Sequence, residues 1–484
     1  MPKYLSKSKF LSGSQCHKKL WLEVNRRDLA TPVSAAQEWI FEQGNQIGHL
    51  ATQQFPDGVE VDHSDFFGAV RETQKLMETD VPAIFEATFR VGRLYARVDV
   101  LRRTPYGWDL IEVKGSTRAK PVHIIDIAFQ YHLLKKAGVI VTGLYLMHVN
   151  RDYIQPDDGD FLVIEEVGKE VEAVLPAVVT ELKGLLGVMD RDEPDVPIGT
   201  HCSDPYDCPF QEHCWSFLPT ESVLTIPSLK KVKAFEMVHA GIHNACDVPE
   251  DTHLSDKQRA YVNRLRTGEV DFDMSGIESM LAELTPPYYF LDFETDNPAL
   301  PRADGLSPYA KMPYQYSCHI VDSNGDMRHV EYLHDDLSDP HSVLASRLVN
   351  DLGESGSIIA YNAGFEQGVI RDLAGRAPSL SAELLVLNDR FWDLLVLVRK
   401  YIEHPGFLGS KSIKNVLPVL VPGFSYEGMV VANGSDAGGW WNKMIRMQDG
   451  AAKEAIREDL LAYCRMDTLA MVKIWEVLRH PPDS

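Results

Sequence analysis

The order of local patterns in residues 83–149 constrains the fold most strongly. Three strand-like segments come first, separated by turn signals at Gly92 and at 105–107, and this arrangement predicts an antiparallel meander. A helical segment follows over 124–137 and ends at Gly138, a residue type that commonly terminates helices. Another strand-like segment completes the series. This order of three strands, a helix and a strand predicts a mixed sheet with helices on its faces, in an α/β protein.

The length of the chain and its linker-like segments predict several domains. A chain of 484 residues is too long for one ordinary hydrophobic core. Residues 217–228 read as a linker, and the sequence TPP at 285–287 marks a second boundary. From residue 288 onwards strand-like segments give way to helical ones, which predicts a second α/β domain. We therefore expect three domains, with the following boundaries: 1–217, 222–284 and 288–484.

The middle segment is mostly helical in pattern. Around Gly241 the sequence predicts a helix, a turn and a second helix. This order resembles a helix-hairpin-helix, whose turn amides can bind a DNA phosphate. A packing module between two larger domains is an equally good interpretation.

A first group of polar residues lies on the predicted meander. Asp99 and Glu112 occupy neighbouring strands, Lys114 follows two residues later on the same face, and Glu86 precedes them. Two carboxylates suit a hard divalent cation such as Mg²⁺. A nearby lysine can stabilise charge that develops on a phosphate. Taken alone, the Glu112–Lys114 pair is more typical of an exposed strand pair.

A second group of acids interrupts an apolar strand. Asp292 and Glu294 alternate with apolar residues, so both lie on one face of that strand. Two acids in such a strand are costly unless they bind something, and a pair of divalent cations is the natural partner. Further polar residues follow downstream, with the last two on one helical face: Asn362, Glu366, Tyr463 and Asp467.

The cysteines are spaced as metal ligands. Cys202, Cys208 and Cys214 are each separated by five residues, and Cys16 lies far upstream. Four thiolates can hold an iron–sulfur cluster or a zinc ion. Three of them can also hold zinc with a histidine as fourth ligand, and two histidines lie close by: His201 and His213. The remaining cysteines (Cys246, Cys318 and Cys464) are interpreted as small buried side chains.

The charge and hydropathy patterns limit the choice of partners. A net charge of −22 argues against a general polyanion binder, although residues 1–30 and 90–120 are locally basic. No apolar stretch reaches the ~20 residues needed to span a bilayer, and the basic start lacks the apolar core of a signal peptide. We therefore expect a cytoplasmic protein without a membrane partner, whose cysteines bind metal or stay reduced.

Residues 1–216 resemble the RecB-like branch of the PD-(D/E)xK nuclease superfamily. The shared features are the acid at Asp99, the Glu112-x-Lys114 strand and Gln130 on the next helix. The resemblance implies that Asp99 and Glu112 bind metal, that Lys114 is catalytic and that Gln130 supports them. It also implies that Glu86 is an outer ligand. The family's early-helix histidine follows a glycine by four residues, whereas here Gly48 takes that place after Gly44, so His49 is the substitute candidate ligand.

The same resemblance bears on the cysteines. RecB-like nucleases that carry an iron–sulfur cluster take one cysteine before the nuclease motifs and three after them. Cys16 and the group at 202–214 follow that arrangement. The resemblance therefore favours a [4Fe–4S] cluster, with zinc as the alternative. Its implied role is to hold a DNA-contacting flap in place rather than to transfer electrons.

Residues 288–480 look like the DEDDy branch of the DnaQ-like, RNase H-fold exonucleases. The resemblance implies Asp292, Glu294 and Asp467 as ligands of two Mg²⁺ or Mn²⁺ ions, with Tyr463 positioning the attacking water. Glu366 stands where the family has aspartate, which puts the strict two-metal geometry in question. Three further residues are candidates for this domain: Asp393 as a fallback acid or a simple helix-capping residue, and Lys411 and Lys414 as phosphate contacts.

As a whole, the chain resembles an uncharacterised bacterial family that fuses an iron–sulfur RecB-like nuclease to an RNase H-like exonuclease. The resemblance implies a metal-dependent nuclease that hydrolyses DNA at two sites. It implies no biological role, and we expect one in end processing, repair or phage defence. Alternatives are RNA as substrate of the second site, or a degenerate second domain that binds nucleic acid or a partner. The sequence has no G-x-x-x-x-G-K-[ST] loop, so a separate helicase or ATPase would supply any unwinding.

Overall fold

The computed structural model describes residues 3–156, 159–431 and 433–480. The chain divides into two compact units, and each combines separate stretches of sequence. The outermost residues of the predicted domains, 1–2 and 481–484, lie outside the described residues. Unit 1 contains the chain up to Val33, Ile40–Phe217 and Ala299–Tyr309; unit 2 contains Ser34–Trp39, Leu218–Pro298 and the chain from Ala310 onwards.

Unit 1 is built on a mixed sheet with the strand order β2-β3-β4-β5-β6-β7, and β1 pairs with β4. Neighbours are parallel in the pairs β2–β3, β5–β6 and β1–β4 and antiparallel elsewhere. The predicted antiparallel meander, the helix and the strand that follows it are confirmed, and the sheet is mixed as predicted because that strand, β6, is parallel to β5. The strands are β1 (Leu5–Ser6), β2 (Val59–Glu60), β3 (Ala83–Val91), β4 (Leu94–Thr104), β5 (Gly107–Lys114), β6 (Val141–Val149) and β7 (Leu162–Glu166).

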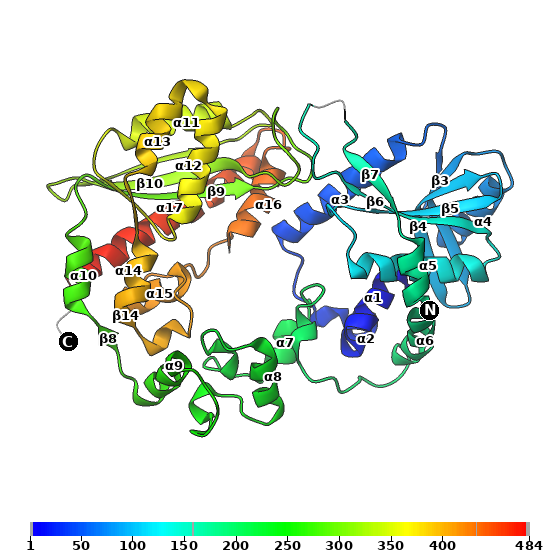
Figure 1. Cartoon of the computed structure of the whole chain (residues 1–484), viewed down its shortest axis with the longest axis horizontal. Helices are drawn as coiled ribbons and strands as arrows, with labels where there is room; N and C mark the ends of the chain where they lie inside the picture. The colour runs from blue at the N-terminus through cyan, green and yellow to red at the C-terminus, as the bar shows by residue number, and fades with distance from the viewer. Residues whose placement is uncertain (1–2, 157–158, 432, 481–484) are drawn as a thin grey trace. The chain divides into compact units, whose positions relative to one another are not determined.

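Helices cover both faces of this sheet, as Figure 1 shows in blue and cyan. On one face α5 packs with α1 and α6 around Phe10, Phe129 and Leu182. On the other face α3 buries Ile47 and Ala51 against Phe85, Val100 and Ile111 of the strands. The helices are α1 (Lys7–Gln15), α2 (His17–Asn25), α3 (Ala35–Gln53), α4 (Phe66–Met77), α5 (Pro121–Lys136), α6 (Gly168–Val188) and α7 (Gln211–Trp215).

Unit 2 is built on a second sheet, with the order β11-β10-β9-β12-β13. The central strand β9 is antiparallel to β10 and parallel to β12, and β13 continues the parallel side. The strands are β9 (Tyr288–Asp296), β10 (Met312–Val321), β11 (Met327–Leu333), β12 (Ser357–Ala360) and β13 (Phe391–Asp393); a separate ribbon pairs β8 (Asp271–Phe272) with β14 (Ile402–Glu403).

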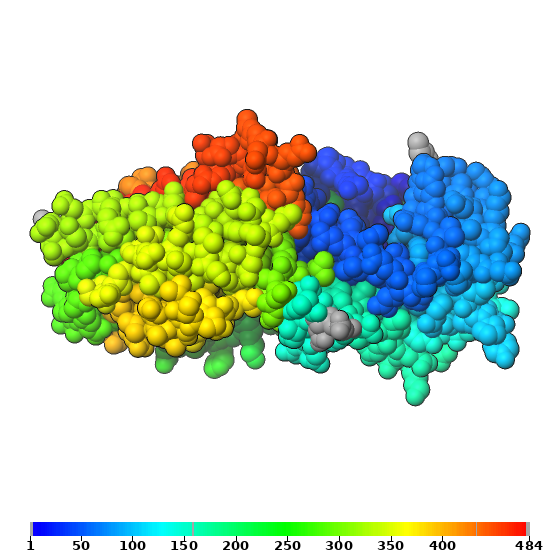
Figure 2. All heavy atoms as spheres, turned by 90° about the horizontal axis from the view of Figure 1, so that it is seen from above, coloured from blue at the N-terminus to red at the C-terminus, as the bar shows by residue number. Residues whose placement is uncertain are grey.

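The alternation of side chains along β9 gives its two faces different helices. Leu291 and Phe293 pack with α11, α12 and α13, whereas Phe290 packs with α14, α15 and α17. In Figure 2 the yellow atoms of α11–α13 and the orange and red atoms of α16 and α17 lie on opposite sides of this unit. Asp292 and Glu294 therefore point to the α17 side.

The helices of unit 2 lie between residues 231 and 479. Within the described ranges, no helix is both long and apolar enough to cross a membrane. The helices are α8 (Lys231–His239), α9 (Asp256–Thr267), α10 (Met274–Leu281), α11 (His341–Leu352), α12 (Gly364–Arg376), α13 (Ser381–Asn388), α14 (Leu394–Tyr401), α15 (Ile413–Leu420), α16 (Gly434–Met444) and α17 (Ala451–Arg479).

The segment 222–284 differs from the sequence prediction around Gly241. The first helix, α8, and the left-handed turn at Gly241 (φ 81°) are present. The predicted second helix is wrong, because only the single 3₁₀ turn Ala245–Asp247 follows, capped by the side chain of Asn244. Pro249 comes two residues later and lacks the backbone N–H needed to extend a helix.

Candidate functional site

In unit 1 the strands β4 and β5 separate where their acids lie. Their ladder ends at the pair Val100–Ile111, one residue before Asp99 and Glu112 would face each other. The backbone N–H of Val113 instead donates to Asp99 Oδ2 at 2.8 Å. The carboxylate of Asp99 thus takes the place of a ladder carbonyl, which fixes its direction.

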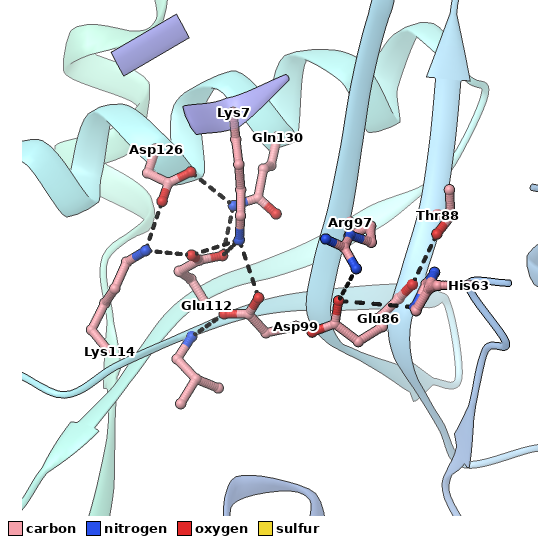
Figure 3. A network of polar contacts seen from close by, with 11 residues as sticks. Lys7, His63, Glu86, Thr88, Arg97, Asp99, Glu112, Lys114, Asp126 and Gln130 are labelled. Atoms are coloured by element: carbon pink, nitrogen blue, oxygen red, sulfur yellow. Dashed lines mark hydrogen bonds and ion pairs between the residues drawn. The ribbon is translucent and has the colours of Figure 1, made fainter. Parts of the chain in front are cut away.

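Glu112 is fully buried and is the centre of a polar network (Figure 3). Its Oε1 accepts from Lys114 Nζ at 2.6 Å and from Lys7 Nζ at 2.9 Å. Its Oε2 accepts from Gln130 Nε2 at 2.6 Å. Asp126, one helical turn before Gln130 on α5, accepts from Lys114 Nζ at 2.8 Å. The structure therefore brings Glu112, Lys114 and Gln130 together.

Lys7 lies between the two acids of this group. Its Nζ is 3.1 Å from Asp99 Oδ1 and 2.9 Å from Glu112 Oε1, and it comes from the first turn of α1. Burial and the charge of Glu112 raise the pKa of Asp99 to about 6. Burial alone would raise the pKa of Glu112 as well, but Lys114 and Lys7 hold it below its usual value. The two ammonium groups thus largely neutralise the carboxylates in the absence of a metal.

This network opens into a cavity of about 620 Å³. Glu86 lines it and has a left-handed backbone (φ 54°), which is strained for a residue other than glycine. Its carboxylate lies 3.7 Å from Arg97 and 3.9 Å from His63. His49 of α3 also lines the cavity, so this substitute for the early-helix histidine does face the same space as Asp99.

In unit 2 three acids form a second, different cluster. Asp292 and Glu294 come from β9 and Asp467 from α17, and one carboxylate oxygen of each lies within 4.8 Å of the others. Within the described chain this is the one place where three metal-ligating side chains converge so closely. The spacing is typical of residues that share a cation.

The electrostatics of this second cluster favour cation binding. Burial and the charge of Asp467 raise the pKa of Glu294 to about 8, and the same two causes raise the pKa of Asp292 well above its usual value. Burial raises the pKa of Asp467 to about 6. Like charges held together out of water repel each other unless protons or metal ions neutralise them. The charge of Lys414 opposes the shift at Glu294 and Asp467 but does not cancel it.

Two tyrosines and a lysine border the second cluster. Tyr426 donates from its hydroxyl to Asp467 Oδ1 at 2.6 Å. Tyr463, one turn before Asp467 on α17, accepts from Lys414 Nζ at 3.3 Å. The Lys414 ammonium also lies 5.1 Å from the ring centres of both tyrosines. Tyr463 therefore lies beside the acids, as predicted.

Glu366 lies close to the cluster without joining its closest three. It is in the first turn of α12 and is almost fully buried, and its Oε2 has no hydrogen-bond partner within the described structure. Burial, with a contribution from Asp393, raises its pKa to about 8, and its own charge raises the pKa of Asp292. A buried carboxylate oxygen without a partner is costly, so Glu366 is suited to keep its proton or to bind a cation.

Asp393 has a structural role. Its Oδ1 accepts from the N–H groups of Leu395 and Val396 and so caps α14. It also accepts from the backbone N–H groups of Asn362 and Ala363. The helix-capping interpretation of this acid is confirmed.

The four predicted metal-binding cysteines line one cavity in unit 1. Cys16 lies between α1 and α2, whereas Cys202, Cys208 and Cys214 come from the segment around α7. Burial raises the pKa of Cys208 to about 11, and the nearby thiols of Cys202 and Cys16 add to this effect. Cys16 and the cysteines at 202–214, which are far apart in the sequence, thus line the same cavity.

Three contributing residues were not predicted from the sequence. Lys7 gave no local signal, because it is one of several basic residues near the N-terminus. Asp126 was detectable as an acid four residues before Gln130 on an apolar helix. Tyr426 comes from a loop with no helical or strand pattern. Lys411, predicted to contact phosphate, donates to the carbonyl of Ile402 and to the carboxylate of Glu403, both in β14.

Comparison with known protein families gives a match for part of the chain. Residues 289–412 are similar to a domain of unknown function, DUF2779. The match begins in β9 and includes Asp292, Glu294 and Glu366, but it ends before α17. Among curated proteins, none matches the chain.

The raised pKa values of the second cluster predict how metal binding depends on pH. In the metal-free fold Glu294 and Glu366 keep their protons up to about pH 8, so a cation must displace them. Apparent Mg²⁺ affinity should therefore rise between pH 6 and pH 8, by up to about tenfold per pH unit for each proton displaced. Without metal, stability should fall over that range, because these acids bind more protons folded than unfolded.

Melting temperatures with Mg²⁺ and with EDTA, measured from pH 6 to pH 8.5, test this expectation. The difference between the two should widen as the pH rises. A variant that carries Asp292→Asn should lose most of this widening. A metal-dependent shift in melting temperature that stays constant with pH would contradict the expectation.

Proposed function

We propose that the protein is a metal-dependent nuclease that hydrolyses DNA phosphodiester bonds with two active sites. The observation that carries this proposal is the buried cluster of Asp292, Glu294 and Asp467, whose oxygens converge within 4.8 Å. A pair of divalent cations held by such acids is a common solution for phosphodiester cleavage. The network of Asp99, Glu112 and Lys114 provides a second arrangement of metal ligands and lysine.

The sheet of unit 2 supports an RNase H-like exonuclease domain. Its acids lie on the central strand β9 and on α17, which packs against that strand, as the motif resemblance implies. The strand order, with β10 antiparallel within an otherwise parallel centre, is compatible with that fold. The mixed sheet of unit 1, with Gln130 on the helix after the Glu112 strand, is likewise compatible with a RecB-like nuclease domain.

At the second site each residue has a role that follows from its position. Asp292, Glu294 and Asp467 would hold Mg²⁺ or Mn²⁺, and Glu366 lies near enough to contribute once its proton is lost. When bound, such ions lower the pKa of water and neutralise charge on the phosphate. Tyr463 would orient the attacking water, and Lys414 beside it would hold the phosphate or the departing strand.

At the first site Lys7 and Lys114 contribute positive charge beside the proposed metal ligands. Asp99 and Glu112 would hold a divalent cation, with Glu86 and His49 lining the same cavity. A cation bound between Asp99 and Glu112 would displace the ammonium of Lys7, which lies there. Lys7 and Lys114 would then face the substrate phosphate and stabilise the negative charge that develops on it.

The cavity lined by the four cysteines supports a structural [4Fe–4S] cluster in unit 1. All four thiols line one cavity, as four cluster ligands would have to do. The resemblance to RecB-like nucleases with one cysteine before and three after the nuclease motifs favours the iron–sulfur cluster over zinc. Cys16, Cys202, Cys208 and Cys214 would hold it, and it would link the N-terminal helices to the end of the domain.

The proposal extends to setting and partners. We place the protein in the cytoplasm, at DNA ends or single strands, in repair or phage defence, together with a separate helicase or ATPase. RNA remains the alternative substrate for the second site, because the RNase H fold serves both polymers.

Digestion of DNA labelled separately at its 5′ and 3′ ends, with Mg²⁺ or Mn²⁺, tests the proposal. Asp99→Asn should remove the products of the first site only, and Asp292→Asn those of the second site only. The same assay with labelled RNA assigns the substrate of each site. Unchanged cleavage in both single variants would reject the two-site model. Loss of all products in one variant alone would reduce the model to one active site.

A further inference from the structure

A large cavity of about 1060 Å³ lies in unit 2, and none of the three acids lines it. Its walls come from the start of the 222–284 segment, from α9, from the end of α14 and from the loop that precedes α15. Cavities for one small ligand measure roughly 300–1,000 Å³, so this one can take more than a single small molecule. Nothing in the proposed chemistry of the two sites uses it.

The lining of this cavity is basic, in contrast to the chain as a whole. Lysine and arginine contribute five lining residues, whereas Glu403 is the one acid among them. The full chain has a net charge of −22, so a basic cavity is not expected from composition. The basic lining residues are Lys257, Arg264, Arg399, Lys400 and Lys411.

Glu403 neutralises only part of this charge. It binds Lys411 at 2.7 Å and lies 3.7 Å from Arg264. Lys257, Arg399 and Lys400 are exposed and form no ion pair within the part of the chain that the structure describes. All three thus keep an unneutralised positive charge that can attract an anionic ligand, and Lys400 also lies over the ring of Tyr401, 4.8 Å from its centre.

The walls of the cavity are held in place by close backbone packing. Gly409 has a left-handed backbone (φ 72°), and a Cβ at this position would lie 1.8 Å from the carbonyl oxygen of Thr225. The hydroxyl of Tyr361 donates to the carbonyl of Lys411 at 2.7 Å. The cavity is therefore already formed before any ligand binds.

Polar and aromatic groups in the lining suit a nucleotide chain. Tyr361 presents a ring beside the basic residues. His404 accepts the backbone N–H of Gly406 through Nδ1, and burial lowers its pKa, so the neutral ring carries its proton on Nε2. That N–H can donate to a phosphate or a base, and aromatic rings among basic residues are typical of single-strand binding.

The cavity leads towards the second acidic cluster. Asn362 lines it, and the backbone N–H of Asn362 donates to Asp393, whose charge raises the pKa of Glu366. On another side Ile413 lines the cavity, and the next residue, Lys414, reaches the hydroxyl of Tyr463. A strand held in the cavity would thus be close to the acids.

We infer that this cavity, defined by Lys257, Arg399 and Lys400, binds the phosphate backbone of single-stranded nucleic acid and guides its end to Asp292 and Asp467. This inference rests on the proposed function of the second site and specifies the form of its substrate. A duplex would have to be unwound before its strand entered. The site therefore selects single strands rather than a base sequence.

Binding of a fluorescent oligothymidylate to the full chain, measured by anisotropy in EDTA, tests the inference without cleavage. Lys257→Ala combined with Lys400→Ala should weaken binding about 10- to 30-fold near 0.1 M salt and reduce the salt slope by about 1.4. The matched control is Lys230→Ala with Lys231→Ala, two exposed lysines of the same segment that do not line the cavity. The control should bind like the wild type.

Three results would overturn the inference. These are unchanged binding by the cavity variant, an equal loss in the control variant, and competition by polyglutamate as strong as that by unlabelled oligonucleotide. The last result would assign the cavity to acidic polypeptides. A failure of the proposed function would give a different result. In that case the oligonucleotide would still bind to the cavity, but Asp292→Asn would leave cleavage unchanged.

Discussion

Replacing Asp292 by Asn is expected to lower the exonuclease rate of the second site by about 10³-fold or more. The change removes one of three converging carboxylates from the centre of β9 while keeping the volume of the side chain. A metal ion contributes several kcal/mol to charge stabilisation in the transition state, and about 4 kcal/mol corresponds to 10³-fold in rate. The loss should appear in the turnover rate more than in substrate affinity, because the basic cavity is left unchanged.

A matched variant separates this effect from a general loss of negative charge. Glu458→Gln removes one exposed carboxylate from α17, the same helix that carries Asp467. It should keep the wild-type rate and the wild-type number of bound Mn²⁺ ions, counted by electron paramagnetic resonance. Asp292→Asn should bind fewer ions. Full Mn²⁺ binding and full activity in Asp292→Asn would contradict the proposal that the second cluster binds metal.

Replacing Cys16 by Ser is expected to remove the cluster and to destabilise unit 1. Cys16 is the one cysteine of the four that comes before strands β2–β7, so its loss opens the link between the N-terminal helices and the segment around α7. For a covalent cross-link that closes a loop of this size, the chain-entropy model gives about 5 kcal/mol. That amount corresponds to a fall in melting temperature of roughly 10 °C for a unit of this size.

Iron and sulfide content, visible absorbance and melting temperature of anaerobically purified protein measure this effect. Cys246→Ser is the matched control, because Cys246 does not line the cysteine cavity. It should keep the iron, the colour and the melting temperature. Wild-type protein that is colourless, contains zinc and is active would replace the cluster by zinc. Wild-type protein with neither metal would reject both.

Much of the fold was predictable because periodicity reports directly on which side chains face a core. The alternation in β3, β4 and β5 and the turns between them predicted the meander correctly. The α/β character of the C-terminal part is also confirmed, with acids two residues apart on β9. The turn at Gly241 was predictable from glycine, but the missing second helix depended on a cap at Asn244 that competes with helix formation.

The parts of the sites that escaped prediction are those made by tertiary contacts. Lys7 and Glu112 are 105 residues apart in the sequence, and nothing in the residues around Lys7 distinguishes it from Lys3 or Lys9. The basic cavity likewise combines α9 with the loop before α15, which are far apart in the sequence. Residues on one strand or one helix, such as Tyr463 and Asp467, were easier to associate because local geometry fixes their spacing.

The interleaving of the two units has a consequence for how the chain is made. Unit 1 includes Ala299–Tyr309, where the N–H of Ala299 donates to Gln43 Oε1 and the hydroxyl of Tyr309 donates to the carbonyl of Gly115, next to Lys114. A ribosome that adds roughly 5–20 residues per second delivers this segment several seconds after Phe217. Unit 1 is therefore completed only when synthesis of unit 2 is under way. Expression of residues 1–217 alone would leave out a part of the first unit that the full chain supplies late.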